Sequence, residues 1–481
     1  MDCLGITKAV FSYTALNREK QESSKRAVSM EQILHTLHEF VWSPGMLAFF
    51  LLTGIYFTVQ SKFYSILRIR QWFGQTLGSL FKNPQVRNTK EIQAVSQFQS
   101  FCTALAATLG TGNITGVATA IMAGGPGSIF WMWISAVLGM MTNYAENYLG
   151  ITYRYKDEKG QWVGGAMVYI EKGLGCKWLA VVFSLCCIGA SFGMGNMVQG
   201  NSMANGLKNV FQIPVFFTAV ASAVVVAYIL NGGMKRIAVC TEKLVPLMAG
   251  IYLITACGIL IVCRHSVGWA FLEIIKNAFT LRAACAGVGG YQLKTIIQTG
   301  ISRGVFSNEA GLGSSVIAHA QSDVEKPEIQ GMWGIAEIFV DTILVCTVTA
   351  LVLLVSGVYR PEIFIQNFST GIENIDGTTL MARAFGSVIP FGEELLVLST
   401  VLFALATMIG WSCLGERTAV YLAKEKGTKI YKWLYVAVAF LGCMLAPAMI
   451  WELSDTLNGL MAIPNLLALF LLRKEVQYPK K

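Results

Sequence analysis

Two short polar, glycine-rich segments interrupt otherwise apolar stretches of this chain. The first is residues 110–113 (Gly-Thr-Gly-Asn), and the second is residues 304–311 (Gly-Val-Phe-Ser-Asn-Glu-Ala-Gly). In a bilayer, the N–H and C=O groups that an unwound helix exposes are costly unless protein, water or ligand satisfies them, so such breaks persist where they line a cavity. A matched pair of breaks in the two halves of a chain indicates a substrate site near the middle of the membrane. The pairing therefore predicts a transporter.

The residue types at the breaks suit an amino-acid carboxylate and a sodium ion. Glycines without a Cβ let a ligand approach the backbone, while Thr111 and Asn113 add side-chain oxygens. The N-terminus of the new half-helix presents free N–H groups, which suit a carboxylate. Backbone carbonyls at the other half-helix end, with the oxygens of Thr108, Asn113 and Asn308, are the hard neutral donors that sodium accepts.

Two simpler explanations compete with a binding site. Glycines also allow helices to pack closely in membranes, and for a single glycine we favour that explanation. Because both segments carry an asparagine beside a serine or threonine, we favour the site for the pair. A nucleotide-binding loop is a weak competitor, since residues 110–112 have neither a preceding strand nor the lysine of a P-loop.

Polar residues in two further apolar stretches could face the same cavity. Gln199 is one candidate, and Thr407 and Trp411 share one helix face because they lie four residues apart. The Trp411 ring would limit the volume available to a substrate, although ordinary packing also explains it. Asn196 and Asn201 flank Gln199, and hydrogen bonding between helices explains them as well as a site does.

Ionisable side chains at membrane depth are functional candidates because charge is costly there. Apolar stretches contain Glu146, Arg303, Glu309, Glu337, Asp341 and Glu416. Arg303 and Glu309 flank the second segment and could form a gate or a structural ion pair, and we favour the structural pair. Glu146 and Glu416 lie near predicted cytoplasmic ends, where we expect them to reach the interface or to pair with basic loops.

Composition identifies a polytopic membrane protein. Apolar residues make up 54% of the chain and charged residues 14%, and several apolar runs reach the roughly 20 residues that cross about 30 Å of hydrocarbon. The first run, Phe40 to Val59, spans a membrane by itself, so it is expected to remain as an anchor. The basic residues gather in particular loops, which indicates membrane orientation and not nucleic-acid binding.

Hydropathy predicts about eleven membrane-spanning helices. Their approximate ranges are 40–61, 97–122, 127–152, 178–207, 213–230, 244–263, 290–319, 333–358, 391–422, 431–447 and 454–472. The loop 62–92 is strongly basic and is therefore predicted to be cytoplasmic. Because successive spans cross in alternating directions, the N-terminus is then predicted outside the cell and the C-terminus in the cytoplasm. The membrane is predicted to be the plasma membrane. Loops 264–289 and 320–332 have charges opposite to those that this orientation predicts.

Setting the first span aside leaves ten, and the two breaks then fall in the first and sixth of these. The two broken helices must cross in opposite directions, as two five-helix repeats of inverted topology require. The predicted organisation is a polar extension (1–39), an extra helix with a basic loop (40–92), a first repeat (93–265), a second repeat (266–473) and a tail (474–481).

Four stretches of the sequence resemble the alanine or glycine:cation symporter family. They are residues 108–114 (Thr-Leu-Gly-Thr-Gly-Asn-Ile), 124–133 (Gly-Gly-Pro-Gly-Ser-Ile-Phe-Trp-Met-Trp), 303–311 (Arg followed by the second segment) and 407–413 (Thr-Met-Ile-Gly-Trp-Ser-Cys). The resemblance extends from about residue 30 over nearly the whole chain. It implies the leucine-transporter fold, with ten core helices of which the first and sixth are broken. By motif, it implies a substrate site made of Thr111, Gly112, Asn113, Gln199, Phe306, Ser307, Asn308, Glu309, Thr407 and Trp411.

Together these observations predict a sodium symporter that imports alanine, glycine or a similar small neutral amino acid by alternating access. Its partners are then the amino acid, co-transported sodium and the lipid bilayer, with no nucleic acid and no obligatory protein. The same fold carrying glutamine, or coupled to protons, is the main alternative, and a channel or a scaffold is a remote one. An enzyme is not expected, because His35, His38, His265 and His319 are scattered at ends and loops.

Overall fold

A computed structural model of the chain describes residues 32–89, 91, 93–279, 289–359, 377–445 and 447–479. Within these ranges the regular structure is almost entirely helical, and the sheet structure is one antiparallel hairpin of β1 (Tyr155–Lys156) and β2 (Trp162–Val163). The predicted all-α class is confirmed. Much of the predicted polar extension, and the acidic residues Glu362, Glu373 and Asp376 of one predicted loop, lie outside the described residues.

The helices follow the apolar runs of the sequence. Those of the first half are α2 (Pro44–Gln60), α3 (Tyr64–Leu67), α4 (Ile69–Gln75), α5 (Gln97–Thr108), α6 (Thr115–Gly124), α7 (Gly127–Tyr153), α8 (Ala166–Leu174), α9 (Lys177–Phe192), α10 (Val198–Phe211), α11 (Val215–Asn231) and α12 (Gly233–Val262). Those of the second half are α13 (Arg264–Phe279), α14 (Gly289–Asn308), α15 (Ser315–His319), α16 (Pro327–Ile338), α17 (Thr347–Val355), α19 (Gly377–Gly386), α20 (Gly392–Met444) and α21 (Pro447–Leu471).

Short helical turns of other types complete the chain. The 3₁₀ turns are η1 (Leu77–Ser79), η2 (Pro84–Val86) and η3 (Thr111–Asn113), and the π-helical turns are η4 (Gly193–Met197) and η5 (Phe339–Cys346). The turn η4 joins α9 to α10, and η5 joins α16 to α17. Because π-helical turns inside α-helices frequently mark functional sites, residues in and around η4 and η5 are candidates for a functional site.

Local sequence explains where several helices begin. Pro44 occupies the first turn of α2, where its missing N–H costs nothing, and the Ser43 side chain accepts a hydrogen bond from the Met46 N–H. Helix α5 begins with a capping box, in which Ser96 and Gln99 each accept a hydrogen bond from the other's backbone N–H at 3.1 Å. Ahead of α2, residues 32–41 are also helical, so the predicted polar extension already forms helix over its last residues.

Six helical stretches of the described residues are long and apolar enough to cross a membrane. They are Gln32–Gln60, Lys177–Phe211, Gly233–Val262, Pro327–Val355, Gly392–Met444 and Trp451–Leu471. The predicted spans 391–422 and 431–447 both lie in α20, which consists of two helices joined at a kink where the backbone of Ala423 and Lys424 is non-helical. These features establish a multi-pass membrane protein, whereas the count of eleven spans stays a prediction.

Both predicted breaks are present, but the second lies later than predicted. The first break (residues 109–114) separates α5 from α6, and the second break (residues 309–314) separates α14 from α15. Gly304 lies inside α14, where a Cβ would approach Ser135 Oγ to 2.2 Å, so close packing explains this glycine. The left-handed backbone of the second break is supplied by Glu309, Gly311 and Gly313, with φ of 55°, 89° and 77°.

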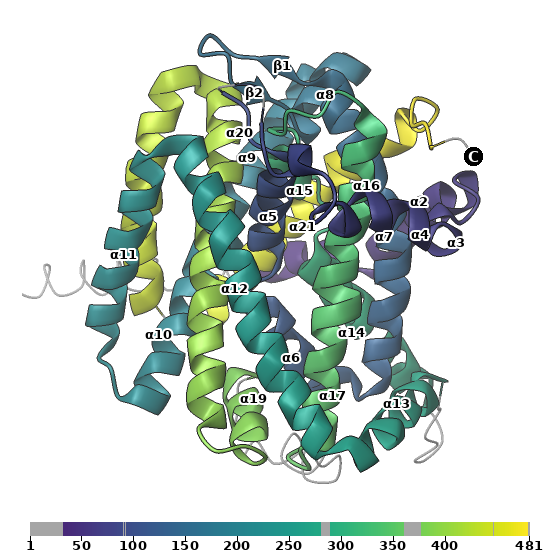
Figure 1. Ribbon diagram of the computed structural model, residues 1–481, viewed down its shortest axis with the longest axis vertical. Coiled ribbons are helices and arrows are strands. Elements are labelled where there is room, and N and C mark those ends of the chain that lie inside the picture. Colours follow the sequence, from purple (N-terminus) through teal and green to yellow (C-terminus); the bar gives the residue numbers. More distant parts are fainter. Residues whose placement is uncertain are drawn as a thin grey trace, which may run out of the picture.

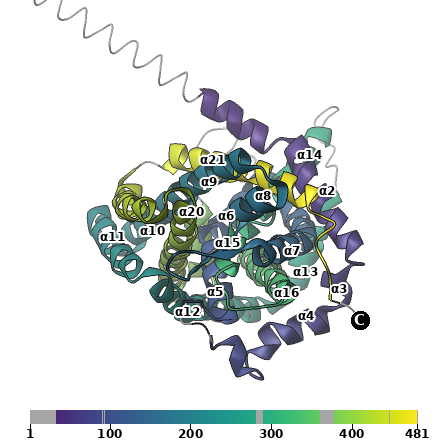
Figure 2. The same ribbon diagram turned by 90° about the horizontal axis from the view of Figure 1, so that it is seen from above.

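The helices that adjoin the first break, together with α15, lie inside the bundle, and the extra N-terminal segment lies at its edge. Viewed from above, α5, α6 and α15 are surrounded by longer helices, while α2, α3 and α4 lie at the periphery (Figure 2). In Figure 1 the β1–β2 hairpin and α8 occupy one end of the bundle, and α13 and α19 occupy the other. The C-terminal end, which is predicted to be cytoplasmic, lies toward the hairpin end of the molecule.

Candidate substrate and ion site

The first break is held open by hydrogen bonds from two neighbouring helices. The Gln199 side chain on α10 accepts from the Thr111 N–H at 3.2 Å and from its hydroxyl at 3.1 Å. Thr407 on α20 donates to the Leu109 carbonyl at 3.2 Å. Within the break, the Gly110 N–H donates to Asn113 Oδ1 at 3.1 Å. The predicted residues Gln199 and Thr407 thus satisfy backbone groups that unwinding exposes.

Steric limits at the first break are severe. A Cβ on Gly110 would lie 2.9 Å from Thr407 Oγ1, whereas one on Gly112 would meet the Phe306 ring at 3.6 Å, an ordinary contact. Trp411 is fully buried, and its ring lies so close to Gly195 of η4 that a Cβ there would approach it to 2.3 Å. The Phe306 ring of α14 therefore bounds the first break at Gly112, and the Trp411 ring of α20 packs against η4.

Asn113 connects the two broken helices through a buried carboxylate. Its Nδ2 atom donates to Ser307 Oγ at 3.0 Å and to Asp341 Oδ1 at 2.8 Å. Ser307 and Thr342 donate to the other oxygen, Asp341 Oδ2, at 2.8 and 2.7 Å. Asn308 joins the cluster through a 3.3 Å hydrogen bond to Thr342. All five side chains are buried, so the first break, the second broken helix and η5 meet at one polar centre.

Asp341 was not assigned to the site from sequence, although it was one of the ionisable residues predicted at membrane depth. The sequence gives no reason to place it beside Asn113, because the two residues lie 228 positions apart along the chain. The signal that could have found it is the combination of a carboxylate with a neighbouring threonine inside an apolar run. Its position in the π-helical turn η5 is visible only in the structure.

The three residues predicted to bind sodium are brought together only in part. Asn113 and Asn308 both join the Asp341 and Thr342 cluster. The Thr108 hydroxyl instead contacts carbonyls of its own helix, the nearer being Leu105 O at 3.4 Å. Both asparagines present their amide N–H groups to the cluster, and their amide oxygens accept from the Gly110 and Ala310 N–H groups. The carboxylate of Asp341 and the hydroxyls of Ser307 and Thr342 are the hard oxygen donors that suit a small cation. The cluster therefore offers chemistry that fits sodium, with Asp341 as its only carboxylate.

Two buried residues outside the predicted site hold the second break. The Gly313 N–H donates to Glu146 Oε1 on α7 at 3.0 Å, and Asn465 on α21 donates to the Gly311 carbonyl at 2.9 Å. Ser314 donates to Glu309, whose side chain is buried. Glu146 is fully buried. The expectation that Glu146 reaches the interface is wrong, because its carboxylate satisfies backbone groups that the second break exposes.

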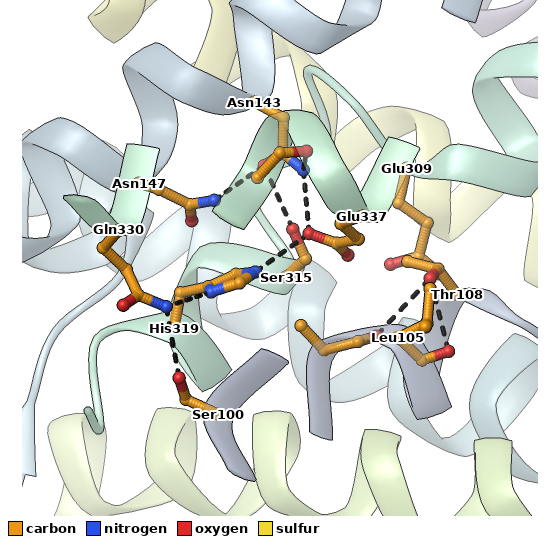
Figure 3. Close-up of polar contacts among 12 residues, drawn as sticks. Ser100, Leu105, Thr108, Asn143, Asn147, Glu309, Ser315, His319, Gln330 and Glu337 are labelled. Carbon is orange, nitrogen blue, oxygen red and sulfur yellow. Dashed lines mark hydrogen bonds and ion pairs between the residues drawn. The ribbon is translucent and has the colours of Figure 1, made fainter. Parts of the chain in front are cut away.

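A second buried polar network lies beside the second break (Figure 3). His319, the last residue of α15, contacts Glu337 on α16 with 3.0 Å between Nε2 and Oε2. Asn143 on α7 donates to the same Glu337 oxygen at 2.8 Å. Gln330 contacts the other ring nitrogen of His319 and donates to Ser100 on α5 at 3.1 Å. His319 was predicted to be one of several scattered histidines, but it is fully buried and contacts α16, whose Glu337 and Gln330 extend the network to α7 and α5.

The remaining candidates have structural partners. Asn196 donates to the Tyr435 carbonyl at 2.8 Å and Asn201 to the Leu445 carbonyl at 2.7 Å, so both link helices. Arg303 does not pair with Glu309. Its nearest carboxylate is Asp455 on α21, with 3.6 Å between Nη1 and Oδ2. Glu416 pairs with Lys432 at 3.2 Å, as expected for a pairing with basic residues.

Comparison with known proteins places this geometry in a family. Residues 27–479 match the model of the sodium:alanine symporter family. The sodium/alanine symporter AgcS of Methanococcus maripaludis is 40% identical over 92% of this chain and 94% of the relative. The protein named "Probable sodium/glutamine symporter GlnT" of Bacillus subtilis is 33% identical over 93% of this chain and 89% of the relative.

A solved structure shows the same architecture. The crystal structure of MhsT in complex with L-phenylalanine superposes with a TM-score of 0.55 at 13% identity, covering 79% of this chain and 90% of that one. This likeness concerns the fold alone and confirms the predicted leucine-transporter-like arrangement. The protein is a cation-coupled amino-acid symporter and not an enzyme, and the chain belongs to the sodium:alanine symporter family.

Proposed function

We propose that the protein imports a small neutral amino acid, alanine or glycine, together with sodium. The observation that carries this proposal is the Asn113 amide, which contacts Ser307 of the second broken helix at 3.0 Å and Asp341 at 2.8 Å. One side chain thus links the first break to the oxygens that suit sodium. The amino acid would lie against Thr111, Gly112 and Asn113, with its carboxylate at the backbone N–H groups of the first break.

Small size would be enforced by the rings around the first break. Phe306 approaches Gly112, and Trp411 fills the space beside Gly195. Coupling follows because sodium at Asp341 would order Asn113, and Asn113 in turn orders the first break through Gly110. If sodium raises the affinity for the amino acid by some factor, the amino acid must raise the affinity for sodium by the same factor.

The test is uptake of radiolabelled alanine into proteoliposomes. An inward sodium gradient should drive accumulation, whereas equal potassium and proton gradients should not. Asn113→Ala, in protein shown to be folded and inserted, should abolish the sodium-driven part because the link between Asp341 and the first break is lost. Full sodium-driven uptake by this variant would refute the placement of the site.

Glutamine transport and proton coupling are the second candidate. The relative GlnT, at 33% identity, motivates the glutamine alternative. Competition of glycine, serine and glutamine with alanine uptake distinguishes a transporter of small amino acids from a glutamine transporter. Glutamine carries a longer side chain that Phe306 and Trp411 would obstruct. Inhibition by glutamine as strong as that by unlabelled alanine would favour glutamine transport. Uptake driven by a proton gradient alone would favour coupling to protons instead of sodium.

The orientation proposed for this function is an external N-terminus and a cytoplasmic C-terminus in the plasma membrane. The basic hairpin segment and the C-terminal end lie toward the same end of the molecule (Figure 1), which supports this arrangement. The division into an extra N-terminal helix followed by two five-helix repeats is part of the same proposal. Protease protection of epitope tags at the two termini tests it, since only the N-terminal tag should be cleaved in intact cells.

A further inference from the structure

The segment that follows α2 is strongly basic and lies on the outside of the bundle. Residues 62–89 contain three arginines and two lysines but no aspartate or glutamate. Lys62, Arg68 and Arg70 are exposed, and none of them forms an ion pair with a carboxylate of the described residues. Viewed from above, α3 and α4 lie at the periphery (Figure 2). Their positive charge is therefore available to a partner outside the protein.

This basic segment begins where two membrane-spanning helices end together. The helical stretches Gln32–Gln60 and Trp451–Leu471 are both long and apolar enough to cross a membrane. Gln60 donates to the Arg473 carbonyl at 3.3 Å, and the Tyr478 hydroxyl donates to Gln60 Oε1 at 3.3 Å. Because the first stretch ends beside the residues that follow the second, we place the start of α3 at the surface of the membrane.

Large apolar side chains are exposed beside the arginines of this segment. Ile66, Leu67, Ile69 and Phe73 are 45%, 71%, 52% and 42% exposed. A segment that lies at the membrane surface buries its apolar side chains at the acyl boundary and directs its basic ones to the head groups. An anionic phospholipid matches both features, because its phosphate pairs with arginine and its acyl chains cover the apolar side chains.

The inner side of the segment is attached to the helix that carries Asp341. Trp72 on α4 is buried, and its indole N–H donates to the Ser65 carbonyl on α3 at 2.9 Å, so α3 and α4 are held together. The Trp72 ring lies 5.7 Å from the ring of Phe339, measured between their centres. Phe339 is the first residue of η5, two positions before Asp341. The position of α4 can therefore affect the position of η5.

We propose that α3 and α4 bind an anionic phospholipid, whose phosphate pairs with Arg68 and Arg70, and that the bound lipid holds η5 in the arrangement that binds sodium. The lipid site does not depend on the proposed function, whereas its effect on sodium rests on it. Lipid held against α4 restricts Trp72, which in turn restricts Phe339. If η5 occupies the binding arrangement for a larger fraction of the time, the apparent affinity for sodium rises by the same factor.

The first experiment measures lipid binding to the purified full-length protein by native mass spectrometry, with phosphatidylglycerol or phosphatidylcholine added. Wild type should retain phosphatidylglycerol in preference to phosphatidylcholine. Arg68→Gln combined with Arg70→Gln should weaken phosphatidylglycerol binding about tenfold or more, because two charges that attract the phosphate are lost. Inorganic phosphate should not displace the lipid, because it has no acyl chain to cover Leu67.

Lys426→Gln combined with Lys429→Gln is the matched control. Both lysines are exposed, and the pair removes the same charge from another predicted cytoplasmic segment. Its phosphatidylglycerol binding should match that of wild type. A wild type that shows no preference for phosphatidylglycerol would overturn the inference, and so would a preference that survives the arginine double change or is lost equally in the lysine control.

The second experiment measures sodium-driven alanine uptake in vesicles of phosphatidylcholine alone and in vesicles that also contain phosphatidylglycerol. In the mixed vesicles, the arginine double variant should need more sodium than wild type for half-maximal uptake, and in phosphatidylcholine alone the two should match. Comparing variants in the same vesicles cancels the effect of lipid charge on the sodium concentration at the surface. In a Phe339→Leu background, the arginine changes should still weaken lipid binding but should no longer alter the sodium requirement.

Equal sodium requirements of wild type and the arginine double variant in mixed vesicles would overturn the effect of lipid on η5. An effect of the arginine changes that persists in the Phe339→Leu background would overturn its route through Trp72. Absence of sodium-driven uptake in every vesicle, with lipid binding present, would instead count against the proposed function and leave the lipid site standing.

Discussion

At the scale of single residues, Gly110 and Gly112 show that two glycines of one motif have different physical roles. A Cβ at Gly110 would lie 2.9 Å from Thr407 Oγ1 and 3.3 Å from the Gln199 amide, which are the groups that hold the first break. A Cβ at Gly112 would meet only the Phe306 ring at 3.6 Å. We expect Gly110→Ala to lower the thermal unfolding temperature in detergent clearly, and Gly112→Ala to change it little. Equal effects of the two variants would contradict this assignment.

Asp341 gives the second prediction at this scale. Asn113, Ser307 and Thr342 all donate to its carboxylate at 2.7–2.8 Å, so its position is fixed before any ion arrives. Asp341→Asn keeps the shape but removes the charge that would balance sodium. The sodium concentration for half-maximal uptake should rise about tenfold or more, which corresponds to about 1.4 kcal/mol.

Glu425→Gln is the control for Asp341, since Glu425 is an exposed carboxylate paired with Lys159 at the surface. Its sodium dependence should match wild type. An unchanged sodium dependence in Asp341→Asn would show that the ion binds elsewhere.

At the scale of elements, the sequence predicted the broken helices well and their polar partners less well. Glycines, threonine and asparagine within an apolar run are a local signal, so residues 110–113 mark the first break correctly. The second break begins at Glu309, where the left-handed backbone starts, whereas Gly304 lies inside α14 and allows close packing against Ser135. Glu146 and Asp341 could not be placed from the sequence, because their partners at Gly313 and Asn113 lie far away along the chain.

The contact between His319 and Glu337 joins α15 to α16, and this predicts a stability effect at the same scale. Both side chains are fully buried, and Asn143 and Gln330 extend the network to α7 and α5 (Figure 3). His319→Ala would leave the Glu337 carboxylate buried without its histidine partner. Loss of one member of such a pair typically costs about 3 kcal/mol or more.

The measurement is thermal and denaturant-induced unfolding in matched detergent. His265→Ala provides the control, because His265 is an exposed residue of α13. Its unfolding should match that of wild type. A His319→Ala protein as stable as the control would mean that the network contributes little to the position of α15.

At the scale of the whole molecule, contacts at the end that carries the β1–β2 hairpin connect segments next to α5, α7 and α15. Val95, just before α5, forms a parallel bridge with Ser322, just after α15. Arg154, at the end of α7, donates to the Ala320 carbonyl at 2.9 Å and also to the Ser322 and Val324 carbonyls. A cavity of about 300 Å³ is lined by Arg303, Phe306 and Asp455 among others, and the Phe306 ring also lies beside Gly112 of the first break. The alternating access that we propose requires these contacts at the hairpin end to separate when the site opens toward that end.

Replacing Arg154 should make these contacts at the hairpin end separate more often. Burial lowers the pKa of its guanidinium to about 10, so it remains charged at neutral pH and its three carbonyl contacts are charge-assisted. Arg154→Gln removes most of these contacts while Val95 and Ser322 stay bridged. We expect faster amide hydrogen exchange across residues 316–324 and a lower sodium-driven accumulation of alanine, because the hairpin end would open more often.

Arg236→Gln is the matched control, since Arg236 donates to the Tyr228 carbonyl at an exposed site away from this segment. Exchange across residues 316–324 that stays at the wild-type rate in Arg154→Gln would show that the bridge alone keeps this end closed.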